Sequence, residues 1–108
     1  MPIANCLVAS DVNPHPETIV TAWSNHAGID PVEMTVNVVQ ARQGGKKYAV
    51  MAWLYLPSLW SEEEVVLLSE GLAAALADVA QVEPSSVHVL TSILTSGSVV
   101  DGGTTLRW

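Results

Sequence analysis

The residue with the clearest chemical potential is Pro2, which follows Met1 and leads directly into the apolar segment 3–8. Initiator methionine is commonly removed when the second residue is small, and its removal here would give Pro2 a free secondary amine. Apolar neighbours disfavour the protonated amine and lower its pKa, so Pro2 could serve as a base for proton abstraction near neutral pH. The alternative is that Pro2 is an ordinary residue at the start of a strand, where proline is tolerated.

Other side chains suited to a site are aromatic or cationic. Trp60 and Trp108 could form the walls of an apolar pocket, although tryptophan is equally typical of a core or an interface. Arg42, Lys46 and Lys47 lie on a predicted turn, from which they could reach a pocket or simply remain solvated. No metal-ligand spacing, phosphate-binding loop, or serine or cysteine nucleophile motif is present, so we expect no metal and no cofactor.

Composition favours a small self-associating protein. The 108 residues are 49% hydrophobic and 14% charged, so the chain has little polar surface, and we expect copies of it to associate. The net charge of −7 disfavours nucleic-acid binding. We expect no membrane span and no secretory signal. The single cysteine, Cys6, is interpreted as a small buried apolar residue in a cytoplasmic protein.

Periodicity and turn residues predict the elements that would position these side chains. Ser61 and Glu64 form a capping-box pattern that opens the strongest predicted helix. The expected strands are 3–8, 34–40, 48–56 and 87–94, and the expected helices are 16–26 and 62–80. Gly97, Gly102 and Gly103 then stand among β-branched residues, which indicates a C-terminal hairpin.

The chain contains an internal repeat with a spacing of 53 residues. Ile29-Asp30-Pro31, followed three residues later by Thr35-Val36, matches Val82-Glu83-Pro84, followed three residues later by His88-Val89. Each copy predicts a right-handed βαβ unit. We therefore expect one α+β domain over 1–108, with unit 1 at about 2–42, unit 2 at about 47–95 and the hairpin at about 96–108. Its four-stranded sheet would carry both helices on one face and leave an apolar face for other copies to cover.

Pro2, the duplicated βαβ pattern and the glycine-rich hairpin together resemble the tautomerase superfamily, which includes oxalocrotonate tautomerase, macrophage migration inhibitory factor and malonate semialdehyde decarboxylase. The resemblance covers nearly the whole chain. It implies a homotrimer in which Pro2 acts as catalytic base or acid in a pocket near a subunit boundary. It also implies that the hairpin containing Val99-Val100-Asp101-Gly102-Gly103 covers that pocket.

The sequence departs from this family where many members bind a substrate carboxylate through arginine. The loop 56–60 and the strand positions Thr35 and His88 carry no arginine. Since tryptophan cannot replace a guanidinium fork, a dicarboxylate would depend on Arg42, its neighbouring lysines or Arg107.

Two further residues acquire candidate roles from the resemblance. His88 would lie on a strand that directs alternate residues into the pocket, or in a subunit interface. Glu33 stands where the decarboxylase branch carries an aspartate that acts with the proline on water, unless it is simply a solvated acid.

These residues predict a tautomerase-like enzyme that uses Pro2 on an enolisable or unsaturated carbonyl compound, without nucleic acid or membrane as partner. A decarboxylase or hydratase activity using Pro2 with Glu33 is one alternative. A weakly active or inactive trimeric protein that binds a small molecule or a protein is the other.

Overall fold

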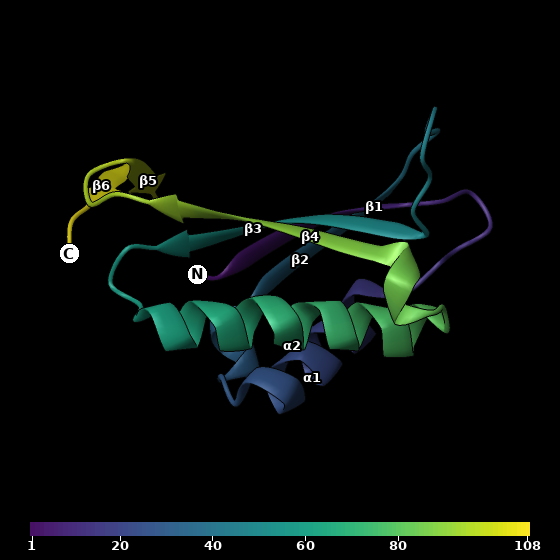
Figure 1. Ribbon diagram of the computed structural model, residues 1–108. Coiled ribbons are helices and arrows are strands. Elements are labelled where there is room, and N and C mark those ends of the chain that lie inside the picture. The colour runs from purple at the N-terminus through teal and green to yellow at the C-terminus, as the bar shows by residue number, and fades with distance from the viewer.

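The computed structural model describes residues 1–108 and contains two βαβ units followed by a hairpin (Figure 1). The first unit consists of β1 (Ile3–Val8), α1 (Pro16–Ala27), the 3-10 turn η1 (Pro31–Glu33) and β2 (Thr35–Gln40). The second consists of β3 (Val50–Pro57), α2 (Glu62–Ala80), the 3-10 turn η2 (Pro84–Ser86) and β4 (Val87–Leu94). The duplication predicted from the repeat is confirmed.

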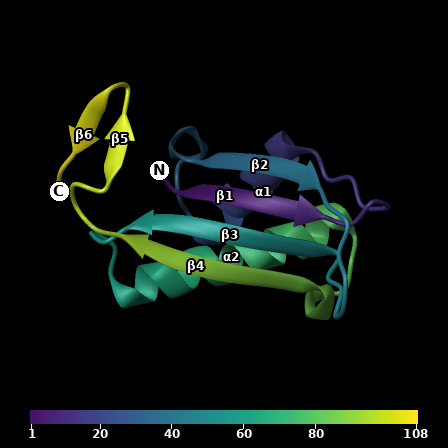
Figure 2. The ribbon, with the colours of Figure 1, turned by 90° about the horizontal axis from the view of Figure 1, so that it is seen from above.

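The four long strands form one mixed sheet in the order β2-β1-β3-β4. Within each unit the strands are parallel, as the crossover helix requires, whereas the central strands β1 and β3 are antiparallel (Figure 2). The register places Ile3 opposite Tyr55 and Leu7 opposite Met51. The start of β1 therefore lies beside the end of β3 and far from the start of β4.

Both helices cover the same face of the sheet (Figure 1). Alternate residues of β1 and β3 point into this core and are almost completely buried: Ala4, Cys6, Val8, Val50, Ala52, Leu54 and Leu56. The side chain of Trp23 on α1 is fully buried, and its Nε1 donates a hydrogen bond of 3.0 Å to the carbonyl oxygen of Leu68 on α2. This bond satisfies the one polar atom of a large core residue and joins the two helices.

The helix boundaries follow from the capping residues. In α2, the Ser61 hydroxyl accepts from the Glu64 N–H at 3.2 Å and the Glu64 carboxylate accepts from the Ser61 N–H at 3.1 Å. This capping box confirms the predicted start at residue 62. Helix α1 runs to Ala27, one residue beyond the expected end, because the chain leaves the helix at Gly28 with φ 67°.

Two strands start later than expected because local hydrogen bonds replace the ladder there, and β3 ends at Pro57, one residue beyond the expected end. Met34 closes η1, its N–H donating to the Pro31 carbonyl, so β2 starts at Thr35 rather than residue 34. Tyr48 is held instead by the Gln43 amide, which accepts from the Tyr48 N–H at 3.0 Å and donates to its carbonyl at 2.7 Å. Strand β3 therefore starts at Val50 rather than at residue 48.

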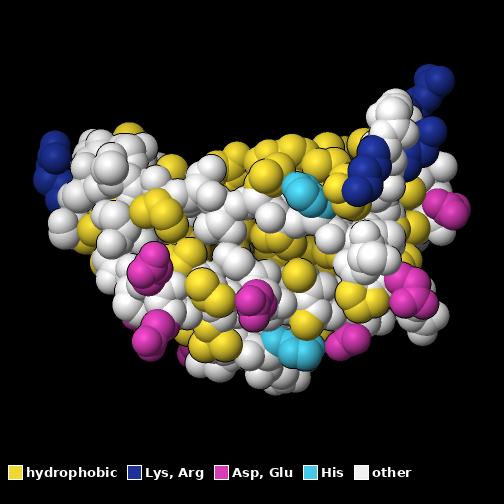
Figure 3. Space-filling view, in the orientation of Figure 1, with side chains coloured by type: hydrophobic (Ala, Val, Ile, Leu, Met, Phe, Trp, Pro, Cys, Tyr) yellow, Lys and Arg dark blue, Asp and Glu magenta, His cyan; other side chains and the backbone are white.

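The opposite sheet face, which we call the open face, carries no Asp, Glu, Lys or Arg side chain. Hydrophobic atoms gather along it, above the sheet in Figure 3. The ladder registers place twelve residues on it: Ile3, Asn5, Leu7, Thr35, Asn37, Val39, Met51, Trp53, Tyr55, His88, Leu90 and Ser92. The Asn37 amide donates a hydrogen bond of 2.9 Å to Asn5 Oδ1, so two polar side chains of the open face are paired with each other.

The C-terminal hairpin consists of β5 (Val99–Asp101) and β6 (Thr104–Leu106), which form a separate two-stranded sheet. Gly102 and Gly103 have φ values of 59° and 83°, which glycine adopts without strain and which explain the predicted turn. The hairpin lies beyond the end of the main sheet where the N-terminus emerges (Figure 2). It is therefore placed to enclose the first residues of the chain.

Candidate functional site

A pocket of about 450 Å³ lies at the N-terminal end of β1. One side is formed by residues around the starts of β1 and β2, and the other by the hairpin. The lining residues are Met1, Ile3, Glu33, Thr35, Val99, Val100, Asp101 and Leu106. The pocket thus exists only because the hairpin folds back toward the N-terminus.

Pro2 lies between two residues that line this pocket, and its side chain is fully buried. Its carbonyl oxygen accepts a hydrogen bond of 3.0 Å from the Thr35 N–H, which fixes the residue at the N-terminal end of β1. While Met1 is attached, the Pro2 nitrogen is an amide and has no basic lone pair. Its chemistry therefore depends on whether Met1 is removed.

Glu33 brings a carboxylate to the N-terminus. Its Oε2 lies 3.8 Å from the Met1 amino nitrogen, and its side chain is 66% exposed. The turn η1 that carries it is capped by Asp30, whose carboxylate accepts from the Val32 N–H at 3.0 Å. Because water screens so exposed a pair, it contributes little to folding stability, but it places an acid beside the amine.

Asp101 was not singled out as a site residue by the sequence analysis, although it belongs to the hairpin expected to cover the pocket. It lines the pocket from the end of β5, opposite Glu33 on η1. Neither Arg nor Lys lines the pocket. Within one subunit the site is therefore acidic, with walls of aliphatic side chains.

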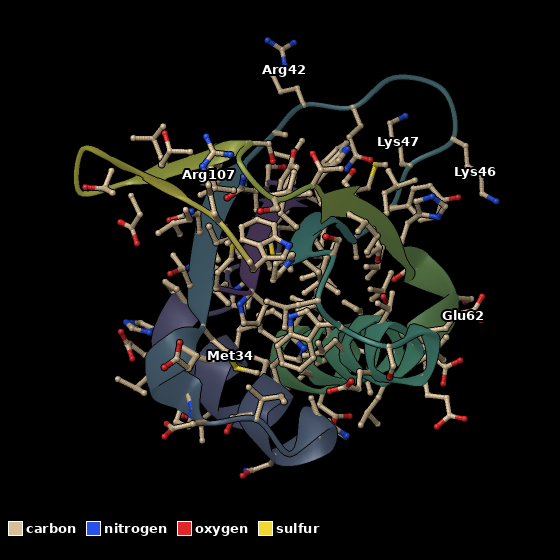
Figure 4. All side chains as sticks on the ribbon, turned by 90° about the vertical axis from the view of Figure 1, so that its left-hand side faces the viewer. Met34, Arg42, Lys46, Lys47, Glu62 and Arg107 are labelled. Carbon is tan, nitrogen blue, oxygen red and sulfur yellow. The ribbon has the colours of Figure 1, made fainter.

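The cations of the β2–β3 connection lie at the other end of the sheet. Arg42, Lys46 and Lys47 extend from this loop in Figure 4. The loop begins where the Ala41 N–H donates to the Val8 carbonyl, at the far end of β1 and ~20 Å from Pro2 at the usual rise per strand residue.

Two of these cations line a separate pocket of their own. It has a volume of about 310 Å³, and Arg42 and Lys47 line it together with Asp11. Within the subunit, Arg42 and Pro2 therefore belong to different sites.

His88 also lies at this distant end, because it pairs with Met51, which in turn is opposite Leu7. Its ring contacts the Tyr48 ring, with centroids 4.8 Å apart. His88 is thus half-buried on the open face and separated from Pro2 by most of the length of β1.

The two tryptophans proposed as pocket walls lie near the β3–α2 connection. Trp60 packs against the edge of the core, and its Nε1 is buried without a hydrogen-bond partner. Trp108 donates from Nε1 to the Ser58 hydroxyl at 2.8 Å. Neither lines the pocket at the N-terminus. Arg107 does not line it either and packs against Gly97, although its neighbour Leu106 does.

No group of three or more His, Cys, Asp or Glu side chains is arranged to hold a metal ion. Neither helix combines the length and the apolar character needed to cross a bilayer.

Comparison with known proteins gives matches only at the level of structure. No protein-family model and no curated protein sequence matches this chain. A fused 4-OT, solved as a symmetric trimer, superposes with a TM-score of 0.79 at 11% identity, covering 97% of this chain and 95% of the other. Malonate semialdehyde decarboxylase gives a TM-score of 0.66 at 16% identity, with coverages of 94% and 91%. The macrophage migration inhibitory factor of Trichinella spiralis gives a TM-score of 0.72 at 17% identity, covering 97% of this chain and 100% of the other.

These likenesses extend over nearly the whole chain, the hairpin included. This chain shares the fold of these solved structures, which confirms at the level of architecture the resemblance inferred from sequence. At such low identities the superpositions show the shared fold and assign no activity to particular residues.

Proposed function

We propose that this chain is a tautomerase-superfamily enzyme in which Pro2, exposed by removal of Met1, transfers a proton on an enolisable or unsaturated carbonyl compound. The observation that carries this proposal is the pocket itself. It encloses the N-terminus between η1 and the hairpin, and Pro2 lies between two of its lining residues. A proton-transfer group must lie within hydrogen-bond reach of its substrate, and a free Pro2 amine would open directly into this space.

The surroundings of Pro2 act on its amine in opposite directions. Burial and the aliphatic walls of Val99, Val100 and Leu106 favour the neutral amine, which is the base form. Glu33 lines the same pocket, and its negative charge would favour the protonated amine, which is the acid form, once Met1 is removed. Thr35 lines the same pocket and offers a hydroxyl that can donate to a substrate carbonyl.

The test is a screen of keto–enol and unsaturated carbonyl substrates on protein whose loss of Met1 has been confirmed by mass spectrometry. Pro2→Ala is the informative variant, because alanine is also small enough for Met1 removal but replaces the secondary amine. We expect it to lose most turnover while keeping its oligomeric state. Retention of Met1 in the native protein would contradict the proposal, since the Pro2 nitrogen would remain an amide.

We further propose that the protein is a homotrimer. The open face carries half-exposed apolar side chains, with Val39 and Leu90 57% and 41% exposed. Covering it with other copies would remove this area from water. The structural likeness to a trimeric fused 4-OT supports three subunits. Sedimentation should therefore give about three chain masses, and a stable monomer at micromolar concentration would contradict this assembly.

A decarboxylase or hydratase activity is the second candidate, favoured by the Glu33 carboxylate, which lines the pocket and lies 3.8 Å from the amine of Met1, the residue attached to Pro2. In that reaction, Glu33 would orient or deprotonate a water molecule beside a protonated Pro2. Glu33→Gln separates the two candidates: it should abolish hydration, while proton transfer by Pro2 alone should survive. A binding protein without activity would show no Pro2-dependent turnover in either assay.

A further inference from the structure

The charges around the N-terminal pocket are unevenly distributed. Glu33 and Asp101 face it from opposite sides, and no cationic side chain lines it. Three of the four cations lie on the loop at the other end of the sheet, and the fourth, Arg107, follows the hairpin and lies against Gly97. Any charged group entering the pocket therefore meets carboxylates first.

The two carboxylates differ in whether a nearby cation offsets their negative charge. Glu33 lies 3.8 Å from the Met1 amine, which offsets part of its charge while Met1 is attached. Asp101 takes part in neither of the two ion pairs of the subunit and makes no side-chain hydrogen bond. Its negative charge is therefore not offset by an ion pair within the subunit.

The aliphatic walls add to this effect. Val99, Val100, Ile3 and Leu106 supply no hydrogen-bond donor to replace the water that a carboxylate would lose on binding. A desolvated anion also interacts more strongly with nearby like charges than it does in water. An uncharged carbonyl compound loses less hydration and gains the apolar contacts.

We propose that the pocket selects carbonyl compounds that carry no carboxylate, and that Asp101 is the residue that most directly rejects the anionic ones. This inference rests on the proposed function, since it concerns the substrate of the same site. It assigns to the hairpin a role in specificity as well as in enclosure.

A matched pair of substrates tests the inference: an aryl-substituted 2-oxo acid and its methyl ester, each supplied as the enol. In ketonisation the enol O–H bond breaks and a C–H bond forms, with no change in oxidation state, and the loss of enol absorbance reports the rate. Each kcat/KM is divided by the rate of the uncatalysed reaction to remove the difference in intrinsic reactivity. We expect the ester to be preferred at least tenfold at low salt, and salt to reduce this preference by screening.

Asp101→Asn should reduce the preference for the ester several-fold by making the acid a better substrate. Glu70→Gln is the matched control, because it removes one negative charge from the exposed face of α2 away from the pocket and should leave the ratio unchanged. If both variants change the ratio equally, the net charge of the protein rather than Asp101 sets specificity. A wild-type preference for the acid would overturn the inference, and loss of that preference in Arg42→Ala would show that a neighbouring subunit supplies the cation.

A binding measurement separates this inference from the proposed activity. Titration of both compounds, followed by the NMR shifts of the Thr35 and Asp101 amides, reports occupancy of the pocket without requiring turnover. Tighter binding of the ester in a protein that has no activity would refute the enzyme but support the selectivity. Equal or tighter binding of the acid would refute the selectivity whatever the activity.

Discussion

Cys6 provides a test of how β1, the strand that follows Pro2, is packed. Its thiol is 1% exposed on the helix-covered face of the sheet, and burial raises its pKa from 9.0 to about 12 by disfavouring the thiolate. In the unfolded chain the thiol titrates near its ordinary value. Between these two pKa values the unfolded state releases a proton that the folded state retains.

The sign and size of the effect follow from this difference. The thiol's contribution to stability is fully present below pH 9 and is lost as the pH rises toward 12. Each pKa unit corresponds to 1.36 kcal/mol, so the wild-type protein should lose about 2 kcal/mol by pH 10.5 through Cys6 alone. Cys6→Ala lacks this titration, although the smaller side chain costs about 1 kcal/mol at every pH.

Urea unfolding of both proteins at pH 8 and pH 10.5 measures the difference, at one protein concentration so that association contributes equally. The wild-type protein should lose about 2 kcal/mol more than Cys6→Ala over this range. Iodoacetamide should also fail to modify folded Cys6 at pH 8, because the thiolate is the reactive form. Equal losses of stability in the two proteins, or rapid alkylation, would show that Cys6 is not packed as described.

Three further predictions concern the loop cations, the helix pair and the open face. Arg42→Ala should leave KM for an uncharged substrate unchanged in steady-state kinetics, because Arg42 is far from Pro2 in its own subunit. A clear rise in KM would place Arg42 in the pocket of a neighbouring subunit. Trp23→Phe should lower the free energy of unfolding by about 2 kcal/mol in urea denaturation, since it removes the bond to Leu68 and leaves a small cavity; a loss below about 0.5 kcal/mol would contradict that packing. Trp53→Glu should dissociate the proposed trimer in sedimentation, because it places a charge in the middle of the open face, while the circular dichroism spectrum should stay native. An intact trimer would show that this face is not the interface.

Most of the secondary structure could be predicted because its signals are local. The Ser61–Glu64 capping pair fixed the start of α2, and the glycines at 102 and 103 fixed the hairpin turn. The errors at residues 34 and 48 arose where a local hydrogen bond competes with the strand ladder. Periodicity indicates where a strand is favoured but does not reveal that Gln43 binds both backbone groups of Tyr48.

The candidate site could be predicted only in part. Pro2 was identifiable because its chemistry depends on its place in the chain, and Glu33 because the resemblance pointed to that position. Asp101 could not be distinguished from an ordinary turn acid until the hairpin was seen to fold over the N-terminus. Trp60 and Trp108 were plausible pocket walls by residue type, yet they lie near Ser58 at the β3–α2 connection.

The sequence by itself determined the two βαβ units and the presence of a proline beside the N-terminus. These properties depend on alternation, caps and turns, which act over a few residues. Only the tertiary structure decided which ends of the strands meet. The antiparallel pairing of β1 with β3 places Arg42 and His88 far from Pro2, while the return of the hairpin brings Asp101 to the pocket that Pro2 adjoins. Such distances depend on the order and direction of the strands. Contacts between residues that are far apart in the sequence set that order and direction.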